Sequence, residues 1–495
     1  MTPSLDPREA WQPLPASEWN AELARHLLRR AGWAARPDEV ARAAQEGLAV
    51  TLDRLFPATP PPLARPAFIP LAQDRIEALR PLKRGALDQE VRRIYEREER
   101  ELERTAGVEL TFKWLQAAAD PSRSAYEKWV LFLTDVYVVS MEKVRSAELV
   151  YQHYDLLRTK GTGTARELTK AVSRSAAMIR YLDLELSSRK APNENFAREL
   201  FELFTLGEGN YTENDIKQAA RAFTGYRHGK DGFRQPERER DTNPKTIFGQ
   251  TGPYLGDDVI DLVYRQPAAA TFLPREMARF YLTDRILPHE FFAPLGQDWR
   301  ASGFNLRELC LRFFGSRAFY APTFRANYIK SPIHFYLGLL QDLGLDVLPL
   351  QRTTLQPLRQ MGQTFLLPPN VRGWVGGRLW INSSTLAARR QLAETLCSPL
   401  DEDRLNADDR LEIEGARDAG HSRFTVDEER IRNFTSLGAA GIADRLCDFF
   451  LPVRVTPEYR ATLTQFLTAS RSAEAETKAR RATIAILQSP EYQLC

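Results

Sequence analysis

The sequence predicts an all-α protein, a large multi-helix, bundle-like single domain with long loops and at most a minor β-hairpin. Three observations lead to this prediction. Apolar residues recur at three- and four-residue intervals along most of the 495-residue chain, which is the period of a helix with one buried face. Strand-like alternation of apolar and polar residues is scarce, and no repeat of fixed period indicates a solenoid. A hydrophobic content of 43% is sufficient for a large core.

The expected organisation has four parts along the chain. These are a polar N-terminal arm at 1–19, a main helical domain at 20–397, a polar linker at 398–433, and C-terminal helices at 434–495 that pack on the main domain. Three segments of the main domain differ in composition from their surroundings. They are a proline-rich connector at 57–70, a charged helix at 84–105 and a loop rich in Gly, Pro and charge at 227–256.

Capping residues and prolines predict where the first helices begin and end. Ser17 is a candidate N-cap for a helix that ends at Ala31, before Gly32, and Pro37 is typical of the first turn of the next helix. The charged helix alternates acidic and basic residues at helical spacing, which indicates a solvated, projecting helix. The last 60 or so residues predict two or three further helices.

Composition excludes several classes of protein. The net charge of +3 is too small to favour nucleic-acid binding. No window approaches 18 uninterrupted apolar residues, so we expect no membrane partner, and the N-terminus lacks the features of a signal peptide, so we expect a cytoplasmic protein. The cysteines are far apart and form no CxxC pair, which argues against a zinc or redox motif: Cys310, Cys397, Cys447 and Cys495.

The densest run of helix signals is APNENFARELFELFTLGEGNYTENDIKQAARAFTGY, residues 191–226. Its apolar residues predict one helix that ends at Gly207 and Gly209. Thr212 and Asp215 then have the spacing of a capping box and predict the start of a second helix. The first helix also carries a polar stripe, which is either a solvated face with internal ion pairs or the wall of a buried site: Asn195, Arg198, Glu199 and Glu202.

The same run closely resembles the signature of the bacterial domain-of-unknown-function family 1800 (DUF1800). Three other stretches resemble this family in the same order along the chain. They are ARHLLRRAGWAARPDEV at 24–40, LPPNVRGWVGGRLWINSSTLAARR at 367–390 and AILQSPEYQ at 485–493. The resemblance implies the family and its helical architecture but no settled activity. Members often lie in operons with a sulfatase-like protein family, so the resemblance implies a partner protein of that type.

The chain departs from the family pattern at three histidines. Related chains usually read Trp-His-Asn-His-Phe where this one reads Leu133, Thr134, Asp135, Val136 and Tyr137, and they usually have histidine at the position of Arg240. Transition metals favour imidazole or thiolate ligands, and none is grouped in this sequence. We therefore expect no tightly bound transition metal and no cofactor.

The sequence leaves two functions open, and it leaves the oligomeric state undecided. The first function is that of a degenerate, non-catalytic member that acts through contacts with the sulfatase-like partner. The second is that of a metal-assisted hydrolase or group-transfer enzyme on an anionic substrate such as a phosphate or sulfate, with its site at the 193–202 helix and the 241–245 loop. Its candidate catalytic residues are Glu199, Glu202, Asp241 and Lys245, and its candidate ligand-binding residues are Asn193, Asn195, Arg198, Asn370, Arg372 and Trp374.

Two structural expectations concern these residues, and the second holds even without any chemistry at the site. We expect Asn195, Glu199 and Glu202 to face the interior or a cleft. We also expect Asp241 to pair with Arg198 or Arg221, and Lys245 to reach Glu199 or Glu202, because partly buried ion pairs of this kind would hold the long loop against the helices.

Overall fold

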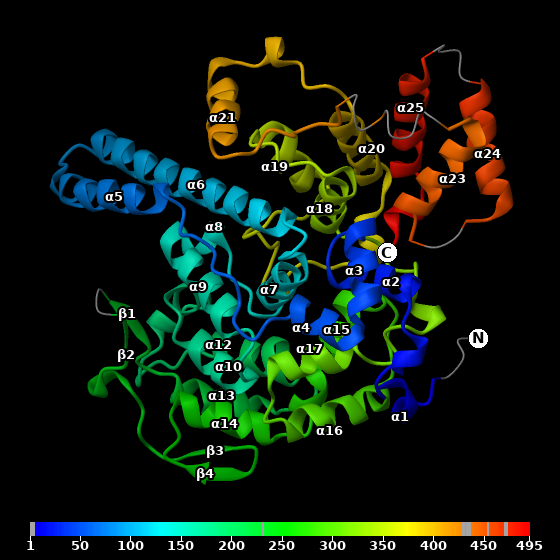
Figure 1. The fold of residues 1–495 in the computed structure, drawn as a ribbon. Coiled ribbons are helices and arrows are strands. Elements are labelled where there is room, and N and C mark those ends of the chain that lie inside the picture. The colour runs from blue at the N-terminus through cyan, green and yellow to red at the C-terminus, as the bar shows by residue number, and fades with distance from the viewer. Residues whose placement is uncertain (1–4, 230–231, 428–430, 432–436, 453–454, 470–473) are drawn as a thin grey trace.

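The protein is predominantly α-helical, as predicted, with short β-hairpins in only one region of the described chain (Figure 1). The structure is a computed structural model, and it describes residues 5–229, 232–427, 431, 437–452, 455–469 and 474–495. No helix in these ranges combines the length and the apolar character needed to cross a bilayer.

The first part of the chain forms short helices, a long helical hairpin and the central helices of the body. Their bounds are α1 (Pro7–Ala10), η1 (Ala16–Glu18), α2 (Ala21–Ala31), α3 (Pro37–Glu46), α4 (Leu48–Leu55), α5 (Phe68–Gly85), α6 (Gln89–Ala119), α7 (Ser124–Val136), α8 (Met141–Val144), α9 (Ala147–Lys160), α10 (Ala165–Ser173), α11 (Ala176–Tyr181) and η2 (Leu184–Leu186). The outer half of the α5–α6 hairpin projects from the body, as expected for the charged helix (Figure 1).

The middle of the chain carries both hairpins and the helices around them. Their bounds are α12 (Asn195–Glu199), the π-helix η3 (Leu200–Thr205), α13 (Glu213–Ala222), β1 (Arg227–Gly229), β2 (Gly232–Arg234), η4 (Glu237–Glu239), β3 (Lys245–Ile247), β4 (Gln250–Gly252), α14 (Gly256–Arg265), α15 (Ala269–Tyr281), η5 (His289–Phe292), α16 (Ala293–Ala301) and α17 (Leu306–Phe314). Each hairpin is antiparallel with three residue pairs, so the 227–256 loop holds two minimal hairpins instead of one.

The last part of the chain forms the remaining helices, of which α18 is completely buried. Their bounds are η6 (Pro322–Phe324), α18 (Pro332–Leu343), α19 (Gln351–Gln360), η7 (Gly377–Trp380), α20 (Ser383–Cys397), η8 (Glu402–Arg404), α21 (Ala407–Asp418), α23 (Ala439–Phe450), α24 (Pro457–Ala469), α25 (Ala475–Leu487) and η9 (Glu491–Gln493). Helix α21 lies within the stretch predicted as a polar linker, and Ile413 and Phe424 bury a small core of their own with Leu348.

Two predicted helix starts differ from the structure. The first long helix begins after Asn20, whose side chain accepts hydrogen bonds from the amides of Glu22 and Leu23, because Ser17 lies within the short 3-10 turn that precedes it. The charged helix begins after Asp88, which caps it, and it runs on to Ala119. The predicted boundary at 105 is absent because the apolar residues that follow continue the same helix without a break.

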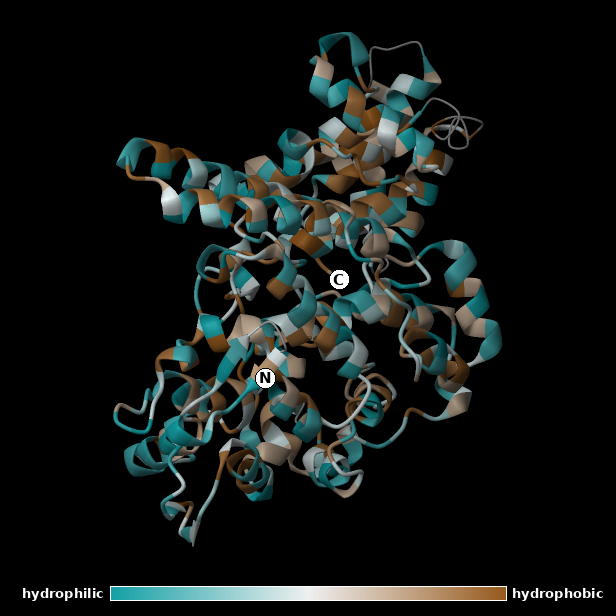
Figure 2. Ribbon diagram, turned by 90° about the vertical axis from the view of Figure 1, so that its left-hand side faces the viewer, coloured by the Kyte–Doolittle hydropathy of each residue, from teal (hydrophilic) through white to brown (hydrophobic). Residues whose placement is uncertain are grey.

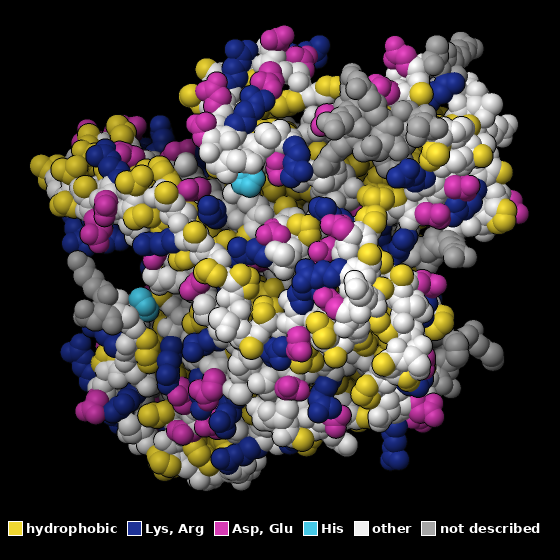
Figure 3. All heavy atoms as spheres, viewed as in Figure 1, with side chains coloured by type: hydrophobic (Ala, Val, Ile, Leu, Met, Phe, Trp, Pro, Cys, Tyr) yellow, Lys and Arg dark blue, Asp and Glu magenta, His cyan; other side chains and the backbone are white. Residues whose placement is uncertain are grey.

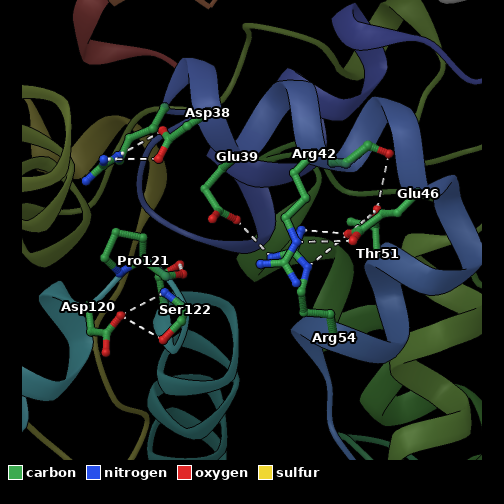
Figure 4. Close-up of polar contacts among 12 residues, drawn as sticks. Asp38, Glu39, Arg42, Glu46, Thr51, Arg54, Asp120, Pro121 and Ser122 are labelled. Atoms are coloured by element: carbon green, nitrogen blue, oxygen red, sulfur yellow. Dashed lines mark hydrogen bonds and ion pairs between the residues drawn. The ribbon is translucent and has the colours of Figure 1, made fainter.

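The main core is one continuous cluster that includes residues of α1 and of α25. Most helices in Figure 2 carry both hydrophobic and hydrophilic residues, as expected for helices with one buried face. Ion pairs support the packing at the N-terminal helices, where Arg54 of α4 contacts Glu39 and Glu46 of α3 at 2.9 and 2.8 Å (Figure 4). Basic and acidic side chains are interspersed on the face shown in Figure 3, so that face has no extended basic patch.

Candidate functional site

A cavity of about 660 Å³ opens between α7, α15, the π-helix η3 and the segment at 371–380. Helix α7 contributes side chains four, three and one residue apart, which places them on one helical face: Lys128, Phe132, Asp135 and Val136. Helix α15 contributes a matching face: Phe272, Arg275, Glu276, Arg279 and Phe280. The remaining wall includes Glu202, Arg372, Trp374 and Trp380, so aromatic rings and charged groups share this cavity.

Lys128 and His334 form a buried polar pair at the cavity. The ammonium of Lys128 donates to the carbonyls of Arg30 and Gly32, at 2.8 and 2.9 Å, and to Nδ1 of His334 at 3.2 Å. Nε2 of His334 lies 3.1 Å from the carbonyl of Trp33, so the neutral tautomer with its proton on Nε2 satisfies both contacts. Burial lowers the pKa of Lys128 to about 7 and, with the positive charge of Lys128, holds the pKa of His334 well below its ordinary value.

Asp135 is the acidic group of the same helical face. Its Oδ1 accepts a hydrogen bond of 2.9 Å from the backbone amide of Trp374. Burial raises the pKa of Asp135 to about 7, although the Trp374 amide and the charge of Arg279 act in the opposite direction.

The segment at 371–380 approaches Asp135 so closely that it requires a glycine. Gly373 has φ of +73°, and a Cβ added there would lie 2.1 Å from Oδ1 of Asp135. Any other residue would displace either the segment or the carboxylate. The glycine of the Gly373-Trp374 pair therefore positions the amide that binds Asp135.

Glu202 reaches the cavity from the π-helix η3. The amides of Leu206 and Gly207 both donate to the carbonyl of Phe201, at 2.9 and 3.0 Å, and complete the wide turn at its end. The Glu202 carboxylate lies 2.6 Å from Nη2 of Arg372 and accepts a hydrogen bond of 3.1 Å from the hydroxyl of Tyr211. Short π-helical stretches are rare and are frequent at functional sites.

The cavity draws on three of the four stretches that carried the family resemblance, through Trp33, Glu202 and Trp374. The sequence model of the family described as "Protein of unknown function (DUF1800)" matches residues 26–494. The chain belongs to the DUF1800 family. No curated protein and no solved structure matches it.

In this DUF1800 protein, three predicted site residues line the cavity, namely Glu202, Arg372 and Trp374. Glu199 is half-buried one turn before Glu202, and burial and the charge of Glu202 raise its pKa, but it does not line the cavity. Asn195 is exposed, so the expectation that it faces the interior or a cleft is wrong. The helix begins at Asn195, and its side chain points outward from the first turn.

Three further predicted residues have contacts outside the cavity. Asn193 accepts a hydrogen bond from the amide of Asn195 and supports the helix start. The guanidinium of Arg198 pairs with Glu194 at 3.3 Å and with Glu213 at 2.8 Å, which is the solvated-face interpretation of the polar stripe. The side chain of Asn370 accepts a hydrogen bond from the amide of Arg372 and forms the turn that precedes Gly373.

The loop residues Asp241 and Lys245 form a separate buried cluster. Asp241 pairs with Arg221 at 2.8 Å, as predicted. Lys245 donates to the carbonyls of Asp241 and Asn243 at 2.7 and 2.9 Å, so the predicted contact with Glu199 or Glu202 is wrong. The side chain of Lys245 is completely buried, and two nearby carbonyls meet its need for acceptors within the loop.

The positions of the three missing histidines lie in different surroundings. Val136 lines the cavity, whereas the hydroxyl of Thr134 donates to the carbonyl of Leu131 in its own helix. Arg240 pairs with Glu237 on the loop. Within the described ranges, no three His, Cys, Asp or Glu side chains come together in an arrangement that could hold a metal ion.

The charged or polar groups of the cavity that were not predicted from the sequence include Lys128, Asp135, Arg275 and His334. One signal was available for two of them. Lys128 and Asp135 stand seven residues apart within a mostly apolar helix, and a charged residue in such a helix requires a buried partner or a cavity. Asp135 stands between the positions of two missing histidines, and without them the sequence of this helix shows no grouped metal-ligating residues.

Proposed function

We propose that this DUF1800 protein binds a small polar molecule in the cavity and exchanges a proton with it through Asp135. The observation that carries the proposal is the place of the Asp135 carboxyl group on the wall of a 660 Å³ cavity, under the segment at 371–380, where burial raises its pKa to about 7. An acid with a pKa close to the working pH is effective both as a general base and as a general acid. Strongly shifted pKa values in a concave site are typical of functional residues.

The proposed reaction is of the acid–base class. The ionised carboxylate of Asp135 takes a proton from an O–H, N–H or activated C–H group of the ligand, and the protonated form returns it to the product. Lys128 lies two helical turns away on the same face, about 10 Å along the axis of α7. A ligand of that length contacts both ends of the face, with Trp374 and Trp380 beside it.

Glu202, Arg372 and Trp374 support the predicted enzyme in part, because they line the same cavity as Asp135. Asp241 and Lys245 do not line this cavity, and their contacts favour a structural role that holds the loop on α13. The metal-assisted form of the reaction stays a prediction of the sequence.

A binding experiment with a blocked cavity tests the proposal. Leu203 lines the cavity and is half-buried, so Leu203→Trp reduces the space without removing a charged group. Leu186→Trp at an exposed position, with 69% of the residue accessible, is the matched control. We expect mass spectrometry to find at least one compound from a polar metabolite extract enriched on the wild type and on Leu186→Trp but not on Leu203→Trp. Equal enrichment on all three folded proteins, or on none, would contradict the proposal.

A second candidate function is the predicted contact with a sulfatase-like protein, and one observation favours a protein contact. The tip of the α5–α6 hairpin exposes Leu82 and Leu87, and Val91 and Ile94 follow on α6. Exposed apolar groups that lie close together often mark protein interfaces. We expect Leu82→Asp with Leu87→Asp to abolish co-purification with such a partner, and unchanged co-purification would exclude the hairpin tip as its interface. The cytoplasmic location likewise stays a prediction.

A further inference from the structure

We infer that the molecule bound in the cavity carries an anionic group, a carboxylate or a phosphate, and that Arg275 binds this group. The inference rests on the proposed binding function and adds the chemical class of the ligand. Lys245, a candidate catalytic residue of the predicted enzyme, lies outside the cavity, and backbone carbonyls engage its ammonium.

Arg275 differs from the other arginines of the cavity in its partners. Arg279 pairs with Glu276 at 2.9 Å, and Arg372 pairs with Glu202 at 2.6 Å and with Glu208 at 3.0 Å. Arg275 has no carboxylate within ion-pairing distance among the residues that the structure describes. Its Nη1 donates to the ring of His289, at 2.8 Å from Nε2, and its Nε is buried without a hydrogen-bond partner in the same set of residues.

These contacts leave the guanidinium with donors to spare. A guanidinium has five N–H donors, and a planar pair of them matches the two oxygens of a carboxylate or phosphate. Burial lowers the pKa of Arg275, but an arginine retains its charge at neutral pH. A half-buried cation without a counter-ion binds an anion more strongly than an exposed one, because less water screens it.

The surroundings of Arg275 hold it in place and keep space beside it. Its guanidinium carbon lies 6.0 Å from the centre of the Phe272 ring. Gly207 has φ of +82°, and a Cβ there would lie 2.9 Å from Nη2 of Arg275, so the end of the π-helix leaves room for the guanidinium. Arg275 and His289 also border a second cavity of about 580 Å³, so the pair stands where the two spaces meet.

The position of Arg275 relative to Asp135 indicates how a ligand lies in the cavity. Arg279 and Glu276 are close enough to Asp135 to act on its pKa. Arg275 lies four residues before Arg279, one turn or about 6 Å along α15. A small molecule with an anionic group at Arg275 therefore presents its other end toward Asp135.

Binding of two simple anions tests the inference. The probes are inorganic phosphate and acetate, titrated by calorimetry at constant ionic strength against chloride. We expect at least one of them to bind the wild type with a millimolar dissociation constant and to bind Arg275→Gln at least tenfold more weakly. The matched control is Arg312→Gln, which removes an arginine that lines neither cavity and is already paired with Asp298 at 2.9 Å, and it should bind as the wild type does. Arg275→Lys should bind more weakly than the wild type but more tightly than Arg275→Gln, because it keeps the charge and loses the planar pair of donors.

Each outcome decides one claim. Equal binding by wild type and folded Arg275→Gln, or no binding of either anion by the wild type, would overturn the inference. Enrichment of uncharged metabolites alone, independent of residue 275, would also overturn it and leave the proposed function intact. Anion binding at Arg275 without any enriched metabolite would support the anion site and contradict the proposed function.

Discussion

Asp241→Ala is expected to destabilise the fold because Asp241 is the centre of a buried loop cluster. Its carboxylate pairs with Arg221 and accepts a hydrogen bond of 2.8 Å from the amide of Asn243. Its backbone amide donates a further bond of 2.8 Å to the hydroxyl of Thr224. Only 5% of Asp241 is accessible to solvent. Removal of its carboxylate therefore leaves the positive charges of Arg221 and Lys245 without their nearby counter-charge.

The magnitude follows from the burial of the partners. Breaking a fully buried ion pair by removing one partner costs about 3–5 kcal/mol. The side chain of Arg221 is 25% accessible and regains some hydration, so we expect the lower end, about 3 kcal/mol. For a chain of this length that loss corresponds to a fall of about 3 °C in Tm if unfolding is cooperative.

The assay combines urea denaturation with limited proteolysis of the 227–256 loop. Glu213→Ala is the matched control, because Glu213 also pairs with an arginine at 2.8 Å but has a side chain that is 66% accessible, and exposed pairs contribute about 0–1 kcal/mol. Burial acts to raise the pKa of Asp241, but the hydrogen bonds from Arg221 and from the Asn243 amide, together with the charges of Arg221 and Lys245, outweigh it and hold the pKa below its ordinary value. The stabilisation is therefore present above about pH 4 and disappears as the pH falls through the lowered pKa. An Asp241→Ala variant no less stable than Glu213→Ala at pH 7, with the loop equally resistant to protease, would refute this reasoning.

Three other predictions concern the cavity. Asp135→Asn should be more stable than the wild type at pH 8, by about 2–4 kcal/mol, and equally stable near pH 4. The reason is that the folded pKa of Asp135, about 7, lies above the unfolded value, so the wild type loses stability as the pH rises between these values. Parallel profiles of unfolding free energy against pH would contradict this prediction. In chemical denaturation, Gly373→Ala should lower the free energy of unfolding by several kcal/mol more than Gly209→Ala does. Both glycines have positive φ, but only Gly373 lies against Asp135, so equal losses would contradict the close approach. Lys128→Met should destabilise the protein by about 2–4 kcal/mol, because the carbonyls of Arg30 and Gly32 and Nδ1 of His334 lose their hydrogen-bond donor. A loss below about 0.5 kcal/mol in the same assay would contradict this role of Lys128.

The helices were predictable where local chemistry determines them. Thr212 and Asp215 form the capping box that their spacing indicates, and Gly207 and Gly209 adopt the positive φ expected at a helix end. The π-helix at 200–205 was not predictable, because apolar residues at 200 and 204 fit an ordinary helix equally well. Its wider turn depends on hydrogen bonds from Leu206 and Gly207, which sequence spacing does not reveal.

The candidate site was predictable only in part, for a physical reason. Glu202 and Arg372 are 170 residues apart, and nothing in either segment indicates their contact of 2.6 Å. Periodicity identifies the face of a helix but not the element that packs against it. The charged residue at 135 is interpretable only once the segment around Gly373 is known to cover it.

The proposed function depends above all on the titration of Asp135 near neutral pH inside the cavity. Infrared difference spectroscopy measures this directly: spectra of wild type and Asp135→Asn, recorded over a series of pH values on both sides of neutrality, isolate the carboxyl and carboxylate bands of this one residue. We expect the protonated carboxyl band to disappear with a midpoint near pH 7. A midpoint near pH 4, that of an ordinary aspartate at about 3.9, would contradict the proposed role of Asp135.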